Sequence, residues 1–189
     1  SLVHSHSQVM ALTQVPTLVM EECNATRKNK IHENQRFSGR QKSKGFFSEC
    51  PYCEIIKIEA KSKRKIFETK NVIAFAPFAS RFNYEAWIFT KRHKKTMHEL
   101  EENELMDLAA ALKKIIVKLK KINVSYNFFI HYSPEKEKLN ASLRTFSQAG
   151  LHFHIEITPR IATWGGFEIS TNAVINSVMP EDAAGFYRR

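Results

Sequence analysis

Residues 151–158 read Leu-His-Phe-His-Ile-Glu-Ile-Thr, and along this stretch apolar side chains alternate strictly with polar ones. Successive side chains of a β-strand point to opposite faces, so the pattern predicts a strand with one apolar and one polar face. The polar face carries His152, His154 and Glu156. For one such motif, a buried and hydrogen-bonded histidine pair is as good an interpretation as a functional site.

The neighbouring sequence predicts more strands and one long helix. Residues 102–121 have the period of a helix, with an apolar face of five residues and lysines opposite. Strands are predicted at about 54–60, 65–69, 71–77, 84–90 and 126–132. Strands, a helix and again strands indicate an α+β fold with an antiparallel sheet and packed helices. The apolar face of the helix consists of Leu105, Leu108, Leu112, Ile115 and Leu119.

Composition favours a folded, soluble chain. The 189 residues are 43% hydrophobic and 25% charged, and no apolar run approaches the roughly 20 residues of a membrane span. The first 20 residues do not have the pattern of a secretory signal, so we expect a reducing cytoplasm and no membrane. The net charge of +10 could indicate nucleic-acid binding. Because the lysines are spread widely rather than interleaved with aromatics, we expect no nucleic acid and instead small phosphorylated ligands.

The N-terminal part differs in texture from the rest. Residues 1–22 begin with a strand-like apolar stretch from Ser1 to Leu12 and reach a turn at Pro16. Residues 23–48 hold seven basic residues and one acid, which is typical of a linker or a solvated helix. A packed domain is expected over 49–189. The sequence begins with Ser rather than Met, which is compatible with a processed piece or with a fragment of a gene.

A second histidine motif lies near the N-terminus, in His4-Ser5-His6-Ser7-Gln8. A strand here would place His4, His6 and Gln8 on one face. The pattern His-x-His-x-(Gln/Glu) therefore occurs twice, at positions 4 and 152. Two copies indicate an internal duplication in which each unit ends with the same strand.

Cysteine and histidine spacing predicts a zinc site. Cys50-Pro-Tyr-Cys53 supplies two thiolates from one turn, and zinc requires four nitrogen or sulfur ligands in a tetrahedron. His93 and His152 are the candidate third and fourth ligands, with His98 competing for the third position. Reduced core cysteines and a redox pair are the alternatives. Cys23 has no partner pattern and is expected to be a buried thiol.

These motifs, taken in order, resemble those of the galactose-1-phosphate uridylyltransferase family, a duplicated member of the histidine-triad superfamily. Residues 1–8 resemble the active-site segment at the end of that family's first half, and the remainder resembles its second half. The resemblance implies a histidine-triad-like sheet, with 1–22 ending the truncated catalytic half, 23–48 as basic linker and 49–189 as C-terminal domain. The second-half motifs are Cys50–Glu54, Phe75–Phe82, Lys91–His93, Phe128–His131, His152–Arg160 and Gly165–Glu168.

The resemblance implies a nucleotidyltransferase that exchanges UMP between UDP-glucose and galactose-1-phosphate. His6 would be the nucleophile that forms a nucleotidyl-histidine. Gln8 can hydrogen-bond phosphoryl oxygens but cannot donate a proton as a general acid, which favours transfer over hydrolysis. Ser1 corresponds to a serine near the phosphates, whereas Phe167 and Glu168 match positions that contact the hexose.

The resemblance also implies metals and partners. By analogy with the repeat, His152 joins Cys50, Cys53 and His93 around Zn2+. A second divalent metal, Fe2+ or Zn2+, would be held by Glu22, His131, His154 and Glu156, for which a hydrogen-bonded polar cluster is the alternative. Expected partners are a nucleotide sugar, a hexose-1-phosphate and a second copy of the chain in a homodimer. Alternative functions are a nucleotide-sugar phosphorylase or nucleotidyl hydrolase of the same superfamily, or an inactive zinc-stabilised fragment.

Overall fold

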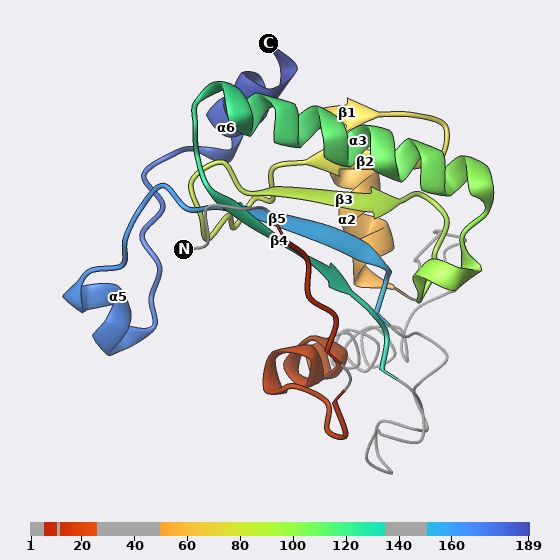
Figure 1. The fold of residues 1–189 in the computed structure, drawn as a ribbon, viewed down its shortest axis with the longest axis horizontal. Coiled ribbons are helices and arrows are strands. Elements are labelled where there is room, and N and C mark those ends of the chain that lie inside the picture. Colours follow the sequence, from red (N-terminus) through yellow and green to blue (C-terminus); the bar gives the residue numbers. More distant parts are fainter. Residues whose placement is uncertain (1–5, 11, 26–49, 135–150) are drawn as a thin grey trace, which may run out of the picture.

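A five-stranded antiparallel sheet forms the centre of the molecule (Figure 1). The computed structural model describes residues 6–10, 12–25, 50–134 and 151–189. The strand order is β1-β2-β3-β5-β4, so β5 lies between β3 and β4 although it comes last in the sequence. The strands are β1 (Lys65–Glu68), β2 (Val72–Phe75), β3 (Ala86–Thr90), β4 (Tyr126–His131) and β5 (His154–Pro159).

Helices cover both faces of this sheet. The long helix α3 (Glu102–Lys121) and the C-terminal helix α6 (Pro180–Arg188) pack on one face, and α2 (Pro51–Glu59) lies on the other (Figure 1). The short helix α5 (Gly166–Thr171) projects away from the sheet, and residues 17–25 form one more helix near β4 and β5. Among the described residues, none of the helices has the length and apolar character needed to cross a lipid bilayer.

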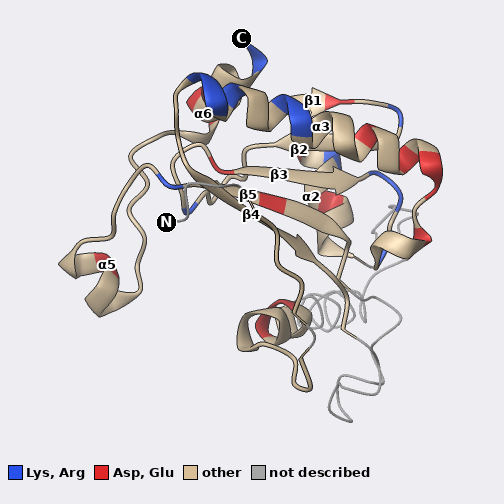
Figure 2. Ribbon diagram, in the orientation of Figure 1, with Lys and Arg blue, Asp and Glu red and all other residues tan. Residues whose placement is uncertain are grey.

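The main core lies between the sheet and α3. Every third or fourth residue of this helix is buried, among them Leu108, Ala111, Ile115 and Leu119. They pack on Val72, Ala74, Ile88, Ile155 and Ile157, which project from alternate positions of β2, β3 and β5. Acidic residues in the first turn of α3 and lysines in its last turn interact favourably with the helix dipole. Figure 2 shows this separation of charge along the helix.

The opposite face of the sheet changes from apolar to polar across its width. Ile73, Phe75 and Phe89 form a small core with Ile56 of α2. Beyond β3, the same face carries His154 and Glu156 of β5. Phe89 pairs directly with His154 across the two strands, so the apolar core of this face borders the polar residues. This border is where the candidate site lies.

The structure confirms an α+β fold with an antiparallel sheet and packed helices, including the helix at 102–121 and strands close to five of the predicted positions. The predicted strand at 54–60 is wrong, because Pro51–Glu59 is helical. Its β-branched Ile55, Ile56 and Ile58 favour a strand locally. Pro51 in the first turn and the burial of Ile56 and Glu59 on one face favour a helix instead.

The strand expected at the N-terminus is also wrong where it can be compared. Residues 6–10 have no regular secondary structure and are exposed. A strand needs a neighbour to satisfy its backbone hydrogen bonds, and these residues pair with no strand in the described part of the chain. Ser1 and His4 lie outside the described residues. So does nearly all of the expected linker at 23–48, whose first residues, 23–25, complete the helix that begins at 17.

Candidate functional site

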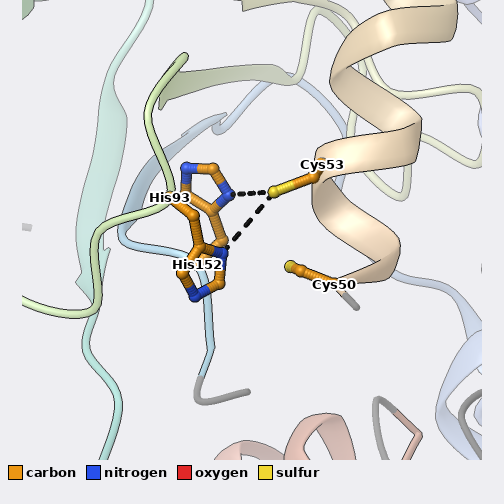
Figure 3. A group of neighbouring side chains, drawn as sticks. All are labelled: Cys50, Cys53, His93 and His152. Carbon is orange, nitrogen blue, oxygen red and sulfur yellow. Dashed lines mark hydrogen bonds between the residues drawn. The ribbon is translucent and has the colours of Figure 1, made fainter. Parts of the chain in front are cut away.

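Four side chains from three segments converge at the N-terminal end of α2 (Figure 3). Cys50 precedes the helix and Cys53 lies in its first turn. His93 follows β3, and His152 precedes β5. We call Cys50, Cys53, His93 and His152 the Cys-His cluster. The structure thus brings together all four residues expected to hold zinc, whereas His98 is exposed and lies outside the cluster.

The distances within the Cys-His cluster fit a tetrahedral ion. Cys53 Sγ lies 3.5 Å from His93 Nδ1 and 3.5 Å from His152 Nδ1. Ligand atoms of a tetrahedral zinc are about 3.5 Å apart when its bonds are ~2.0–2.3 Å long. All four candidate ligand atoms lie within 4.8 Å of one another, and Cys50 and Cys53 form no disulfide. Two thiols and two imidazoles are the donor set that a structural zinc site uses.

Local interactions determine which of these donor atoms carry a proton. His152 Nε2 donates a hydrogen bond to the Thr90 carbonyl at 2.8 Å, which leaves the Nδ1 lone pair directed at Cys53. The hydrogen bond with Cys53, and then burial, raises the pKa of the Cys50 thiol. A protonated thiol is a poor ligand, so binding of a metal here would release a proton.

A second group of polar side chains lies on the same face of the sheet. His131 ends β4, and His154 and Glu156 belong to β5; we call these three residues the His-Glu cluster. Glu156 Oε1 is 3.3 Å from His154 Nε2 and 3.6 Å from His131 Nε2. The His154 ring stacks between Phe89 and His131, with 4.4 Å between ring centroids on each side. Burial lowers the pKa of His154, which favours its neutral form.

Two further residues reach the His-Glu cluster from outside the sheet. Glu22, on the helix at 17–25, has its Oε2 3.0 Å from His131 Nδ1. Arg81 donates to Glu156 Oε2 at 3.3 Å from the loop between β2 and β3. Sequence reasoning named Glu22 but gave Arg81 no role. It also missed Thr90, whose backbone carbonyl accepts the hydrogen bond from His152. Every residue type has such a carbonyl, so no sequence pattern indicates this contact.

The remaining candidate residues are not brought to either cluster. His6 and Gln8 are exposed in the irregular segment at 6–10. Phe167 and Glu168 lie on α5, which projects from the body (Figure 1). Glu168 also has a local role, because its carboxylate accepts a hydrogen bond from the Gly165 amide at 3.0 Å. Cys23 is half-buried, and burial raises its pKa to about 11.

Comparison with known proteins finds relatives that are similar to nearly the whole of this chain. It is 35% identical to ADP-glucose phosphorylase of Arabidopsis thaliana, in a match over 100% of this chain and 47% of the relative. It is 31% identical to galactose-1-phosphate uridylyltransferase of Thermotoga maritima, over 97% of this chain and 54% of the relative. The chain therefore spans about half the length of the curated relatives it matches. No family model matches it.

A solved structure agrees with the sequence comparison. The crystal structure of an Arabidopsis thaliana ADP-glucose phosphorylase with bound ADP-glucose superposes with a TM-score of 0.70 and 31% identity. The match covers 93% of this chain and 50% of the other. The similarity in sequence and in fold thus extends over nearly the same residues.

Proposed function

This chain is related to the galactose-1-phosphate uridylyltransferase-like proteins of the histidine-triad superfamily, and on that premise we propose that it serves nucleotidyl transfer from a nucleotide sugar. One contact carries the proposal. Glu22 Oε2 lies 3.0 Å from His131 Nδ1, which ties the helix that follows the His6 segment to the end of β4. A catalytic segment needs such a rigid support, because a loosely held nucleophile loses the benefit of orientation.

His6 is the proposed nucleophile. Its imidazole nitrogen would attack the α-phosphorus of the nucleotide sugar, forming a nitrogen–phosphorus bond while the bond to the departing hexose-1-phosphate breaks. A phosphate oxygen of the acceptor would then attack the same phosphorus and displace the imidazole. Gln8 would hydrogen-bond the phosphoryl oxygens, but an amide cannot act as a general acid that protonates a leaving group.

The Cys-His cluster is the proposed zinc site of this enzyme. Because its four side chains fill all four positions of a tetrahedron, a Zn2+ ion held there would stabilise the fold and leave no open position for substrate. Its ligands join α2, the residues after β3 and the start of β5. The His-Glu cluster is the proposed site of a second divalent cation, Fe2+ or Zn2+.

The acceptor distinguishes two forms of this activity. With galactose-1-phosphate as acceptor, the enzyme exchanges UMP between UDP-glucose and the second sugar phosphate, as expected from the sequence. With inorganic phosphate it is a nucleotide-sugar phosphorylase, and the 35% identity to ADP-glucose phosphorylase favours this second form as a candidate. Phe167 and Glu168 are proposed to contact the hexose. The protein is further proposed to form a homodimer.

Labelling tests the nucleophile. The protein is incubated with UDP-glucose or ADP-glucose labelled at the α-phosphate, and label on the protein is measured after denaturation. We expect a phosphoramidate that is labile in acid and stable in base. His6→Gly should abolish it, whereas His98→Gln, a change at an exposed histidine outside both clusters, should keep it. Turnover of either nucleotide sugar at the normal rate by His6→Gly would refute the mechanism.

The same labelled protein identifies the acceptor. Galactose-1-phosphate should release the label as a nucleotide sugar if the protein is a uridylyltransferase. Inorganic phosphate should release it as a nucleoside diphosphate if the protein is a phosphorylase. Release by water alone at a comparable rate would contradict both, and would indicate a hydrolase.

A further inference from the structure

The two histidines of the His-Glu cluster have their protons fixed on the far side of each ring. His154 Nδ1 donates to the backbone carbonyl of His152 at 2.7 Å. His131 Nδ1 faces the Glu22 carboxylate at 3.0 Å and donates to it. A neutral imidazole carries one N–H, so each ring, when neutral, has a lone pair on Nε2.

These lone pairs converge on a third acceptor. Glu156 Oε1 lies 3.3 Å from His154 Nε2 and 3.6 Å from His131 Nε2. His131 is 6% exposed, His154 0% and Glu156 3%, so water does not dilute the repulsion among three acceptors. Within the described part of the chain, His131 Nε2 and His93 Nε2 are the buried side-chain nitrogen or oxygen atoms with no hydrogen-bond partner. A positive ion between the three atoms would remove the repulsion among them and would give His131 Nε2 a partner.

Glu22 does not fit as a fourth ligand of such an ion. The atoms that lie within 4.8 Å of one another come from His131, His154 and Glu156, and Glu22 is not among them. Its carboxylate faces the opposite edge of the His131 ring, at Nδ1. Metal-binding histidines commonly donate their second N–H to a carboxylate, which fixes the ring and makes the ligating nitrogen more basic.

We infer that Glu22 is a positioning residue, which holds His131 from its far nitrogen while a divalent cation binds to His131, His154 and Glu156. The four-ligand set expected from the sequence is thereby reduced to three protein ligands. The bound cation would also affect how firmly the helix at 17–25 is held. Because the cation orients His131 and His131 holds Glu22, occupation of the cluster should fasten this helix to the sheet.

Cobalt provides the test, since Co2+ substitutes for Zn2+ and its visible absorption depends on its ligands. The Cys-His cluster is first filled with zinc, and Co2+ is then titrated into the protein and its variants. Glu22→Gln keeps an oxygen that accepts the His131 proton but removes the negative charge. We expect its cobalt spectrum to match that of the unchanged protein, with affinity reduced about 10–100-fold. Glu156→Gln should change the spectrum itself.

Glu21→Gln is the matched control, because Glu21 is exposed on the same helix and its change removes the same charge. Its cobalt affinity should equal that of the unchanged protein. Amide hydrogen exchange gives a second readout: Co2+ should slow exchange over 17–25 in the unchanged protein and in Glu21→Gln, but much less in Glu22→Ala. Zinc content and circular dichroism verify that each variant is folded.

Three results would overturn the inference. One is a change of spectrum in Glu22→Gln like that in Glu156→Gln, which would make Glu22 a ligand. Another is equal affinity in Glu22→Gln, Glu22→Ala and Glu21→Gln, which would leave Glu22 without a role. The last is absence of cobalt binding beyond the Cys-His cluster. None of these readouts involves turnover, so the inference stands or falls separately from the proposed nucleotidyl transfer.

Discussion

Replacing Cys53 by serine should lower the melting temperature by about 8–16 °C. Cys53 Sγ is the atom that both imidazoles of the Cys-His cluster contact, at 3.5 Å each. Apart from this cluster, α2 packs on the sheet through Ile56, its one buried apolar side chain, and through the half-buried Tyr52 and Ile55. Burial of one isoleucine contributes about 1.5–3 kcal/mol. Zinc at 1,000 times its dissociation constant contributes about 4 kcal/mol. For 150–250 residues, each kcal/mol corresponds to about 2–4 °C.

Differential scanning calorimetry at a fixed free zinc concentration measures this effect. Cys23→Ser is the matched control, because it removes a thiol that lies outside the Cys-His cluster. The control should melt close to the unchanged protein. A strong chelator should destabilise the unchanged protein and the control by the amount that Cys53→Ser loses, and should hardly affect Cys53→Ser. If the chelator shifts none of the three, or shifts Cys53→Ser as much as the others, the cluster holds no structural metal.

Three further changes test the packing that supports the site. The Arg92 guanidinium lowers the pKa of the buried Glu104, so this pair stabilises the fold above the ordinary glutamate pKa of about 4.3 and less as the pH falls below it. Arg92→Ala should lower the free energy of unfolding at pH 7 and weaken that acid dependence, as measured by urea unfolding across pH. Tyr187→Phe should cost about 1–2 kcal/mol in the same assay at pH 7, because the hydroxyl donates to the Tyr84 carbonyl at 2.6 Å. Ile115→Ala should cost about 2–5 kcal/mol, because Ile115 is 1% exposed in the main core, and a smaller loss would mean that α3 packs loosely.

The parts of the fold that local sequence determines could be predicted. Glu102–Lys121 keeps its helical period for 20 residues, and the packing of α3 on the sheet acts in the same direction as that preference. Pro51–Glu59 could not be read in the same way, because its isoleucines favour a strand while its long-range packing requires a helix. Tyr84 has a φ of 60°, which is rare for an aromatic residue. Nothing in the local sequence indicates this turn.

The candidate site likewise contains residues that the sequence could identify and contacts that it could not. Cys50 and Cys53 could be chosen from their spacing alone, because two cysteines separated by two residues reach one ion. The juxtaposition of His131 with His154 depends on the register of β4 against β5, which pairs these two residues directly. Register between distant strands is set by tertiary packing and cannot be obtained from the alternation of either strand alone. The contact of Arg81 with Glu156 depends likewise on the course of a loop.

The environment of β5 gives the strongest argument that its polar residues have a function. The sequence alternation predicts a strand with one apolar and one polar face, and a polar face of a strand is commonly exposed to solvent. All six residues of β5 are nevertheless buried, since β3 and β4 flank it and both of its faces are covered. A buried carboxylate without compensation costs several kcal/mol, which is comparable to the entire free energy of unfolding of a small domain. Arg81 reaches Glu156 with one nitrogen at 3.3 Å, while two imidazole lone pairs face the other carboxylate oxygen. An apolar residue at position 156 would avoid this cost, so the buried carboxylate supports the proposal that Glu156 binds a cation together with His131 and His154.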